Sequence, residues 1–183
     1  NDDATLLTER GLAPGNGAMV AALQAATGVD PLIAGKPHRP LLEAALASAG
    51  KGTPLMVGDK LETDIAGAVD VGISSLLVLT GVSAPREVLF APPELRPNHV
   101  AGDLRALREP VDRSLITAQP QWTVRSDGPL TLAAGPSAGI DDVDAVAALR
   151  ALCAAHWSTG AGPIEVCPAD SVAADALRRL ELL

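Results

Sequence analysis

Short apolar runs alternate with segments of helical spacing between residues 31 and 108, and this alternation constrains the fold more than any other feature. Runs typical of buried strands lie at 31–35 (PLIAG), 54–59 (PLMVGD), 74–81 (SSLLVLTG) and 98–102 (NHVAG). Segments with helical apolar spacing lie at 17–28, 40–50, 63–72 and 84–91. Strands and helices that alternate with short connections form a parallel sheet with helices on both faces. We therefore predict an α/β fold with a doubly wound parallel sheet.

The core of such a fold must be built here from aliphatic side chains. Hydrophobic residues make up 48% of the chain, but it has only two Trp, one Phe and no Tyr. A net charge of -8 argues against a general affinity for nucleic acid or anionic membranes, which need clustered Lys and Arg. No apolar run reaches the roughly 18 residues of a membrane span. With two cysteines and no leader sequence, we expect a cytoplasmic protein.

The sequence pattern changes near residue 114. We predict a hairpin formed by 122–128 and 129–135, a helix at 141–157, a strand at 162–168 and a final helix at 170–183. The order of these elements is ββαβα. We place the boundary near 110–118, which gives a first domain at 1–112 and a small α+β domain at 118–183.

Residues able to carry chemistry follow two of the predicted strands. Lys36 comes directly after 31–35, Asp59 ends 54–59, and Asp64 lies at the start of the next helix. Parallel sheets bind ligands outside the carboxyl ends of their strands. Two carboxylates there suit Mg²⁺, and a lysine can neutralise a phosphate. Taken singly, Asp64 could be a helix cap and Lys36 a solvated lysine, whereas together they indicate a site.

Three motifs together resemble a known family: GKP at 35–37, VGDKLETDI at 57–65 and LLVLTGV at 76–82. They are similar to the carboxyl-terminal half of a haloacid dehalogenase (HAD) superfamily phosphatase, over about residues 1–108. The most similar branch is p-nitrophenylphosphatase-like, with a large cap inserted in the core. It includes glycerol-phosphate, phosphoglycolate and pyridoxal-phosphate phosphatases. The implied fold is half of a HAD core, a partial doubly wound sheet.

The resemblance implies Mg²⁺-dependent hydrolysis of a small phosphorylated metabolite through an aspartyl-phosphate. At the matching positions, Lys36 binds phosphate, Asp59 is a metal ligand, and Asp64 is a supporting acid near the metal. The opening NDDATL resembles the nucleophile signature D-x-D-G-T-L, but it stands too close to Lys36 to leave room for a cap. It better matches the return from the cap to the core. Asn1 and Asp3 are therefore expected at the rim of the active site, as substrate-binding residues.

The resemblance also implies that the nucleophile, the acid/base Asp and the cap lie outside this chain. We therefore expect residues 1–183 alone to be inactive and to require the amino-terminal half of the same enzyme, with a homo-oligomer as a further option. The alternative is a non-catalytic scaffold or partner-binding half-domain. The presence of Lys36, Asp59 and Asp64 favours the enzyme, because a scaffold needs none of them.

The ββαβα order of the second domain loosely resembles part of a GNAT acetyltransferase. GNAT enzymes bind the coenzyme A pyrophosphate with Q/R-x-x-G-x-G/A at a helix start. The candidate segment here is WSTGAG at 157–162, where Trp157 replaces the Gln or Arg and a strand follows. We therefore do not expect acetyl transfer.

Overall fold

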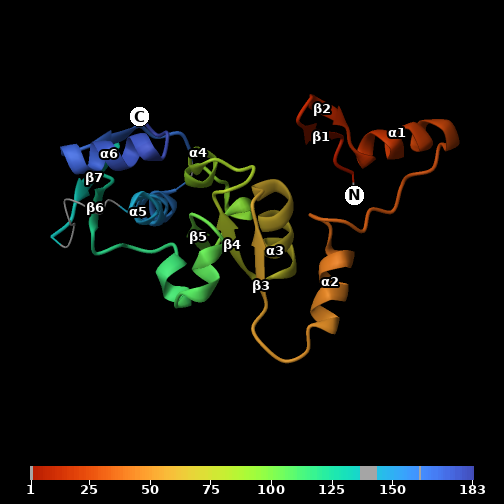
Figure 1. The fold of residues 1–183 in the computed structure, drawn as a ribbon, viewed down its shortest axis with the longest axis horizontal. Coiled ribbons are helices and arrows are strands. Elements are labelled where there is room, and N and C mark those ends of the chain that lie inside the picture. Colours follow the sequence, from red (N-terminus) through yellow and green to blue (C-terminus); the bar gives the residue numbers. More distant parts are fainter. Residues whose placement is uncertain (1, 137–143, 161) are drawn as a thin grey trace.

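The computed structural model describes residues 2–136, 144–160 and 162–183. The described residues form three small sheets with the strand orders β1-β2, β3-β4-β5 and β6-β7-β8 (Figure 1). No helix in this part of the chain is long and apolar enough to cross a membrane.

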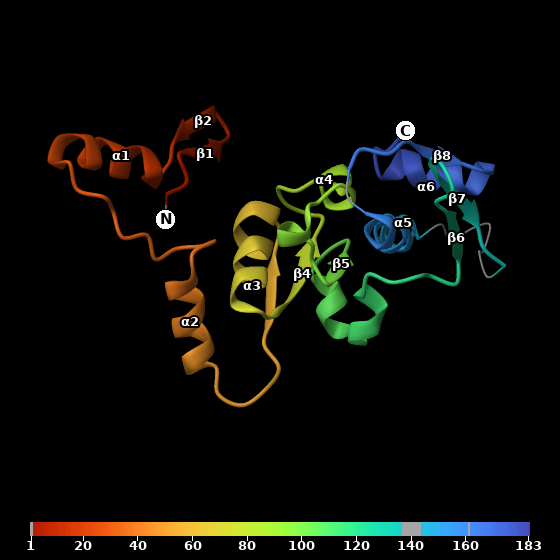
Figure 2. The ribbon, with the colours of Figure 1, turned by 180° about the vertical axis from the view of Figure 1, so that it is seen from behind.

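The amino-terminal unit is a hairpin followed by a helix. Strands β1 (Thr5–Thr8) and β2 (Gly11–Pro14) pair antiparallel, and α1 (Asn16–Thr27) follows. This hairpin was not predicted, because its turn lacks an Asn-Gly pair and its strands do not alternate in polarity. Figures 1 and 2 show this unit set apart from the central sheet, with an extended segment that leads from α1 to α2. Its apolar side chains are exposed, Leu7 to 78% and Leu12 to 74%.

The central sheet is parallel, which confirms the predicted α/β fold. Its strands are β3 (Leu55–Gly58), β4 (Ser74–Val78) and β5 (His99–Ala101). The helices around it are α2 (Arg39–Ser48), α3 (Ala66–Val71) and α4 (Pro85–Leu89). A π-helical turn, Leu61–Ile65, connects β3 to α3 where the sequence predicted a helix at 63–72.

The strand predicted at 31–35 was wrong. Residues 31–34 form no ladder, and Leu32 is 95% exposed. The backbone instead turns into α2, with Leu41 N donating to Ala34 O at 3.0 Å. An apolar run becomes a strand only where a neighbouring strand satisfies its backbone groups, and the described residues place none beside this run.

The tail has the predicted ββαβα order. Strands β6 (Trp122–Arg125) and β7 (Leu130–Ala134) are antiparallel, and β8 (Val166–Pro168) is parallel to β7. The helices are α5 (Ala145–Thr159) and α6 (Ser171–Arg179). Residues 141–143 of the predicted helix lie outside the described residues. Short 3₁₀ segments, Leu104–Arg108 and Val111–Ser114, lead from β5 toward the tail.

One hydrophobic core joins the tail to the central sheet. Leu77 on β4 and Val100 on β5 share it with Leu149 and Leu152 on α5, and all four are fully buried. Each buried leucine stabilises the fold by roughly 1.5–3 kcal/mol. Helix α5 therefore covers the sheet as part of the main core.

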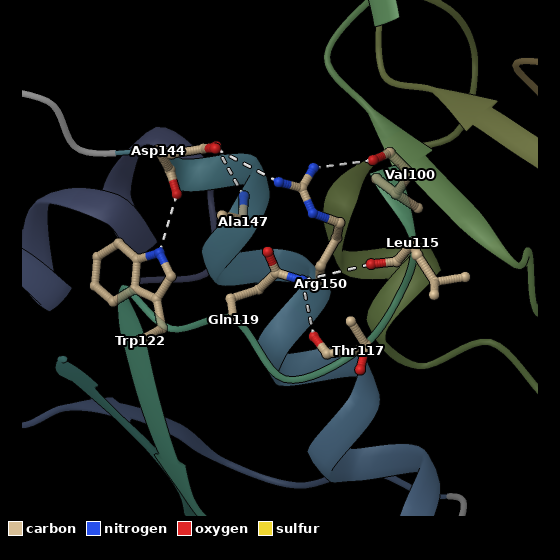
Figure 3. Close-up of polar contacts among 8 residues, drawn as sticks. All are labelled: Val100, Leu115, Thr117, Gln119, Trp122, Asp144, Ala147 and Arg150. Atoms are coloured by element: carbon tan, nitrogen blue, oxygen red, sulfur yellow. Dashed lines mark hydrogen bonds and ion pairs between the residues drawn. The ribbon is translucent and has the colours of Figure 1, made fainter. Parts of the chain in front are cut away.

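Polar contacts cross the same junction. The buried Arg150 donates from Nη1 to Val100 O at 3.1 Å and from Nη2 to Asp144 Oδ2 at 3.4 Å (Figure 3). Trp122 Nε1 donates to Asp144 O at 3.1 Å, and Gln119 Nε2 donates to Thr117 O at 3.0 Å in the connecting segment. These bonds fix α5 against β5 and against the hairpin of the tail.

Candidate active site

The structure brings two of the predicted site residues into direct contact. Lys36 lies just before α2, and Asp64 lies in the π-helical turn after β3. Lys36 Nζ is 2.5 Å from Asp64 Oδ1. The Asp64 side chain is 4% exposed, whereas the Lys36 side chain is 41% exposed. The buried Asp64 therefore holds the lysine in place by an ion pair, and the Lys36 side chain stays partly exposed to solvent.

The Asp64 carboxylate also accepts backbone hydrogen bonds from the loop after β3. Its Oδ2 accepts hydrogen bonds from Asp59 N and Lys60 N, both at 3.1 Å. With Lys36 on Oδ1, both carboxylate oxygens are engaged. Gly58 permits this geometry, because a Cβ there would lie 2.3 Å from Asp64 Cβ. Only glycine lets the strand end pass so close to the buried carboxylate.

Asp59 is half-buried at the carboxyl end of β3, and the loop after β4 holds it. Its Oδ2 accepts from Val82 N at 3.1 Å, and its carbonyl accepts from Ser83 N at 2.9 Å. Ser83 Oγ accepts from Leu61 N at 3.0 Å. A Cβ at Gly81 would lie 1.9 Å from Asp59 Oδ2. The other carboxylate oxygen, Oδ1, receives no hydrogen bond from the described residues.

The segment before β1 reaches the same place. Asp3 Oδ1 lies 3.7 Å from Lys60 Nζ, and Asp2 Oδ2 lies 3.7 Å from His38 Nε2. Lys60 follows Asp59 in the chain, so Asp3 lies beside the candidate site. Asn1, the other residue expected at the rim, lies outside the described residues. The substrate-binding roles of Asn1 and Asp3 stay predictions.

The described residues offer only part of the ligand set that a metal ion needs. The described residues contain no cluster of three His, Cys, Asp or Glu side chains that could hold an ion. Asp59 offers a partly exposed carboxylate whose Oδ1 bonds to none of the described residues, which fits Mg²⁺ as one ligand among waters. Asp64, predicted as a second ligand, uses both oxygens to hold Lys36 and the loop.

The described part of the tail (residues 118–136, 144–160 and 162–183) presents no comparable set of groups. Residues 157–160 of WSTGAG form the carboxyl end of α5 and its cap Gly160, Ala161 lies outside the described residues, and β8 comes later in the chain. The amino end of α5 is capped by the Asp144 carboxylate, which accepts from Ala147 N at 2.8 Å and disfavours an anion there. Burial raises the pKa of the Cys153 thiol, so this cysteine is a core residue and no nucleophile.

The sequence placed Gly81 at the end of a predicted strand without a role, and it gave no sign of Ser83 as part of the site. The LLVLTGV motif includes Gly81 and ends one residue before Ser83, but its resemblance to a family assigned neither residue a role. A residue that shapes a loop from 22 positions away leaves no local pattern in the sequence.

The comparisons with known proteins agree with this geometry. The HAD-hydrolase-like family matches residues 33–107, which include Lys36, Asp59, Asp64 and the loop after β4. Residues 33–107 belong to the HAD-like hydrolases. Beyond this HAD-like domain, residues 119–182 match the GCN5-related N-acetyltransferase-like domain family.

The relatives of this chain are phosphatases by name. D-glycerol 3-phosphate phosphatase of Mycobacterium tuberculosis is 40% identical over 193 residues, covering 100% of this chain and 54% of the relative. The 5'-nucleotidase YutF of Bacillus subtilis is 44% identical over 85 residues, covering 45% of this chain and 33% of the relative. This chain thus spans about half or less of the length of these curated relatives.

A solved structure is similar over the whole of this chain. The crystal structure of glycerol phosphate phosphatase from Mycobacterium tuberculosis in complex with magnesium has a TM-score of 0.87 and 42% identity, over 100% of this chain and 54% of that one. The 4-nitrophenylphosphatase of Thermotoga maritima has a TM-score of 0.53 and 34% identity, over 60% of this chain and 42% of that one.

Proposed function

We propose that this chain supplies half of the active site of a Mg²⁺-dependent phosphatase that hydrolyses a small phosphomonoester of the glycerol-phosphate type. The observation that carries the proposal is the arrangement of Lys36, Asp64 and Asp59. A partly exposed lysine and a carboxylate with one oxygen that no described residue bonds lie on two segments, and the buried Asp64 contacts both. The names of the relatives support the phosphoester class, and glycerol phosphate is the substrate named for the relative matched along the whole chain.

Lys36 binds the phosphoryl group in this proposal. Its ammonium is held at one side by Asp64 and is 41% exposed as a side chain, so it can still meet an anion. A lysine acts there as a compact point charge with three donors. Because its attraction grows as charge develops on the phosphoryl oxygens, it stabilises the transition state as well as the bound substrate.

Asp59 is the metal ligand contributed by this chain. Its Oδ2 is held by Val82 N, which leaves Oδ1 for the cation. When bound, Mg²⁺ supplies positive charge that offsets the negative charge of the phosphoryl group. Asp64 has a different task, since it orients Lys36 and the backbone on both sides of the Asp59 peptide.

We place the nucleophile and the acid/base Asp on the part of the relatives that this chain does not match. Strand β3 supports this, because it is an edge of the sheet among the described residues, yet it ends at the candidate site. The sheet face that carries Leu76 and Val78 has only a small described cluster on it, with Ala101, Val57 and Ala106. A further strand and further helices would cover both features.

The test is phosphate release by the full natural chain that contains these residues. We expect hydrolysis of glycerol 3-phosphate in the presence of Mg²⁺, loss of it with a chelator, and no turnover by residues 1–183 alone. Lys36→Ala should lower turnover and weaken vanadate binding together, while Lys51→Ala, a lysine outside the site, should leave both unchanged. A full chain that releases no phosphate from any small phosphomonoester would contradict the proposal. Steady turnover by residues 1–183 alone would place a nucleophile within them.

A further inference from the structure

We infer that Ser83 is a positioning residue for Asp59, and that the loop after β4 acts as the template that directs the Asp59 carboxylate toward a divalent cation. This inference rests on the proposed role of Asp59 as a metal ligand. It gives a function to the end of the LLVLTGV motif, which the phosphate-binding and metal-binding residues leave unexplained.

Ser83 joins the loop after β4 to the loop after β3 through two hydrogen bonds. Its backbone N donates to Asp59 O at 2.9 Å, and its Oγ accepts from Leu61 N at 3.0 Å. The two partners stand on either side of Lys60. Because Ser83 is only 3% exposed, water cannot easily replace either bond. One buried serine therefore fixes the peptide of Asp59 and the start of the π-helical turn.

The same loop touches the carboxylate itself. Val82 N donates to Asp59 Oδ2 at 3.1 Å, although the Val82 side chain is 66% exposed. Gly81 approaches so closely that a Cβ would stand 1.9 Å from that oxygen. The loop therefore meets Asp59 with backbone atoms, and its position decides which way the carboxylate faces. Hydrogen bonds to a ligating group are known to tune metal affinity strongly.

A packing role alone would not need the Ser83 hydroxyl. Ser75 on β4 is equally buried, at 0% exposure, and its Oγ has no hydrogen-bond partner among the described residues. The two serines thus share burial and size and differ in the contact to the Asp59 loop. Ser75→Ala is therefore a matched control for Ser83→Ala.

The experiment is a calorimetric titration of the full natural chain with Mg²⁺, without substrate. We expect Ser83→Ala to raise the dissociation constant about tenfold, Ser83→Thr to stay near the wild-type value because it keeps the hydroxyl, and Ser75→Ala to change nothing. Gly81→Ala, which crowds Asp59 Oδ2, should weaken binding as well. Gly128→Ala, where a Cβ meets nothing within 4 Å, should not.

Several other outcomes would contradict the inference, and each has a distinct cause. An unchanged dissociation constant in Ser83→Ala, with a lower melting temperature, would show that Ser83 only stabilises the fold. An equal loss in Ser75→Ala would show that the effect is unspecific. If Ser83→Ala does not fold, normal Mg²⁺ binding by Gly81→Ala would overturn the role of the loop. Asp59→Asn tests the proposed metal ligand separately from the role of Ser83. Mg²⁺ binding that survives this change would refute Asp59 as a ligand.

Discussion

Lys36 Nζ lies 2.5 Å from Asp64 Oδ1, although 28 residues separate the two in the chain. The same Asp64 carboxylate accepts from the backbone N of Asp59 and of Lys60. One buried side chain thus sets the position of both groups that we assign to phosphate and metal. The contact also explains why a carboxylate that is 4% exposed is tolerated, because all of its bonds are charge-assisted.

Asp64→Asn should destabilise the protein more than the loss of an exposed ion pair does. The amide has one acceptor oxygen. With that oxygen toward Asp59 N and Lys60 N, its buried NH₂ group faces the Lys36 ammonium; with the opposite orientation, the two backbone N–H groups lose their acceptor. Either arrangement leaves a buried donor without a partner, at a cost of about 1–3 kcal/mol. Urea unfolding measures the change.

The control for Asp64→Asn is Asp175→Asn, which breaks the exposed pair between Asp175 and Arg179 at 2.8 Å. We expect it to cost about 0.5 kcal/mol or less. Equal losses of unfolding free energy in both variants would mean that Asp64 contributes no more to stability than a partner in an exposed ion pair does.

Stability should fall when the pH drops below neutral, and His156 should account for part of the fall. Burial lowers the pKa of this histidine, whose ring packs edge-on against Phe90 with centroids 5.7 Å apart. The unfolded chain then binds a proton at a higher pH than the folded chain does. The free energy of unfolding therefore decreases as pH falls through about 6.5, until the pH passes the folded pKa. Burial lowers the pKa of His99 too, with the same sign.

Melting temperatures at pH 7.5 and 5.5 measure this effect. The decrease should be smaller in His156→Leu than in the wild type, whereas Leu107→Ala, at an exposed residue that does not titrate, should keep the wild-type decrease. The difference between two pH values within one variant removes the packing change that the substitution itself causes. An undiminished decrease in His156→Leu would contradict the assignment.

The fold could be predicted wherever local pattern and tertiary partner agree. The strand expected at 54–59 is observed as Leu55–Gly58, and the helix expected at 17–28 as Asn16–Thr27. The run at 31–35 has the same apolar character, but it has no described strand beside it and stays extended without a ladder. Sheet formation depends on a neighbour, which a single segment does not reveal.

The site residues, too, could be predicted only in part. Asp59 could be chosen because it follows a strand of the parallel sheet, where such sheets present their ligands. Lys36 could be chosen on the same ground, although the apolar run before it forms no strand. The engagement of both Asp64 oxygens could not be predicted, because it depends on the close approach of Gly58 and of a lysine from another element. Ser83 carries a hydroxyl in a loop before a helix, a pattern that equally fits a helix cap.

The shared core predicts that the hydrolase domain and the tail unfold together. Leu149→Ala on α5 removes a fully buried side chain that packs in the same core as Leu77 and Val100, and should cost about 2–5 kcal/mol. Tryptophan fluorescence reports on the tail through Trp122 and Trp157, and far-UV circular dichroism reports on all helices. Both signals should shift in one common urea transition.

Leu107→Ala, at a side chain that is 54% exposed, serves as the control and should leave the transition in place. Two separate transitions, with Leu149→Ala moving only one of them, would show that the tail is an independent unit despite the shared core.

The most direct test of the account is the Mg²⁺-dependent release of phosphate from glycerol 3-phosphate by the full natural chain carrying Asp59→Asn. The amide keeps the size of the side chain and an oxygen for Val82 N, but it loses the charge that a cation needs. We expect turnover to fall by about 100-fold or more, with an unchanged circular dichroism spectrum, while Asp127→Asn in the exposed hairpin loop retains full activity. Wild-type turnover by Asp59→Asn at every Mg²⁺ concentration would contradict the account.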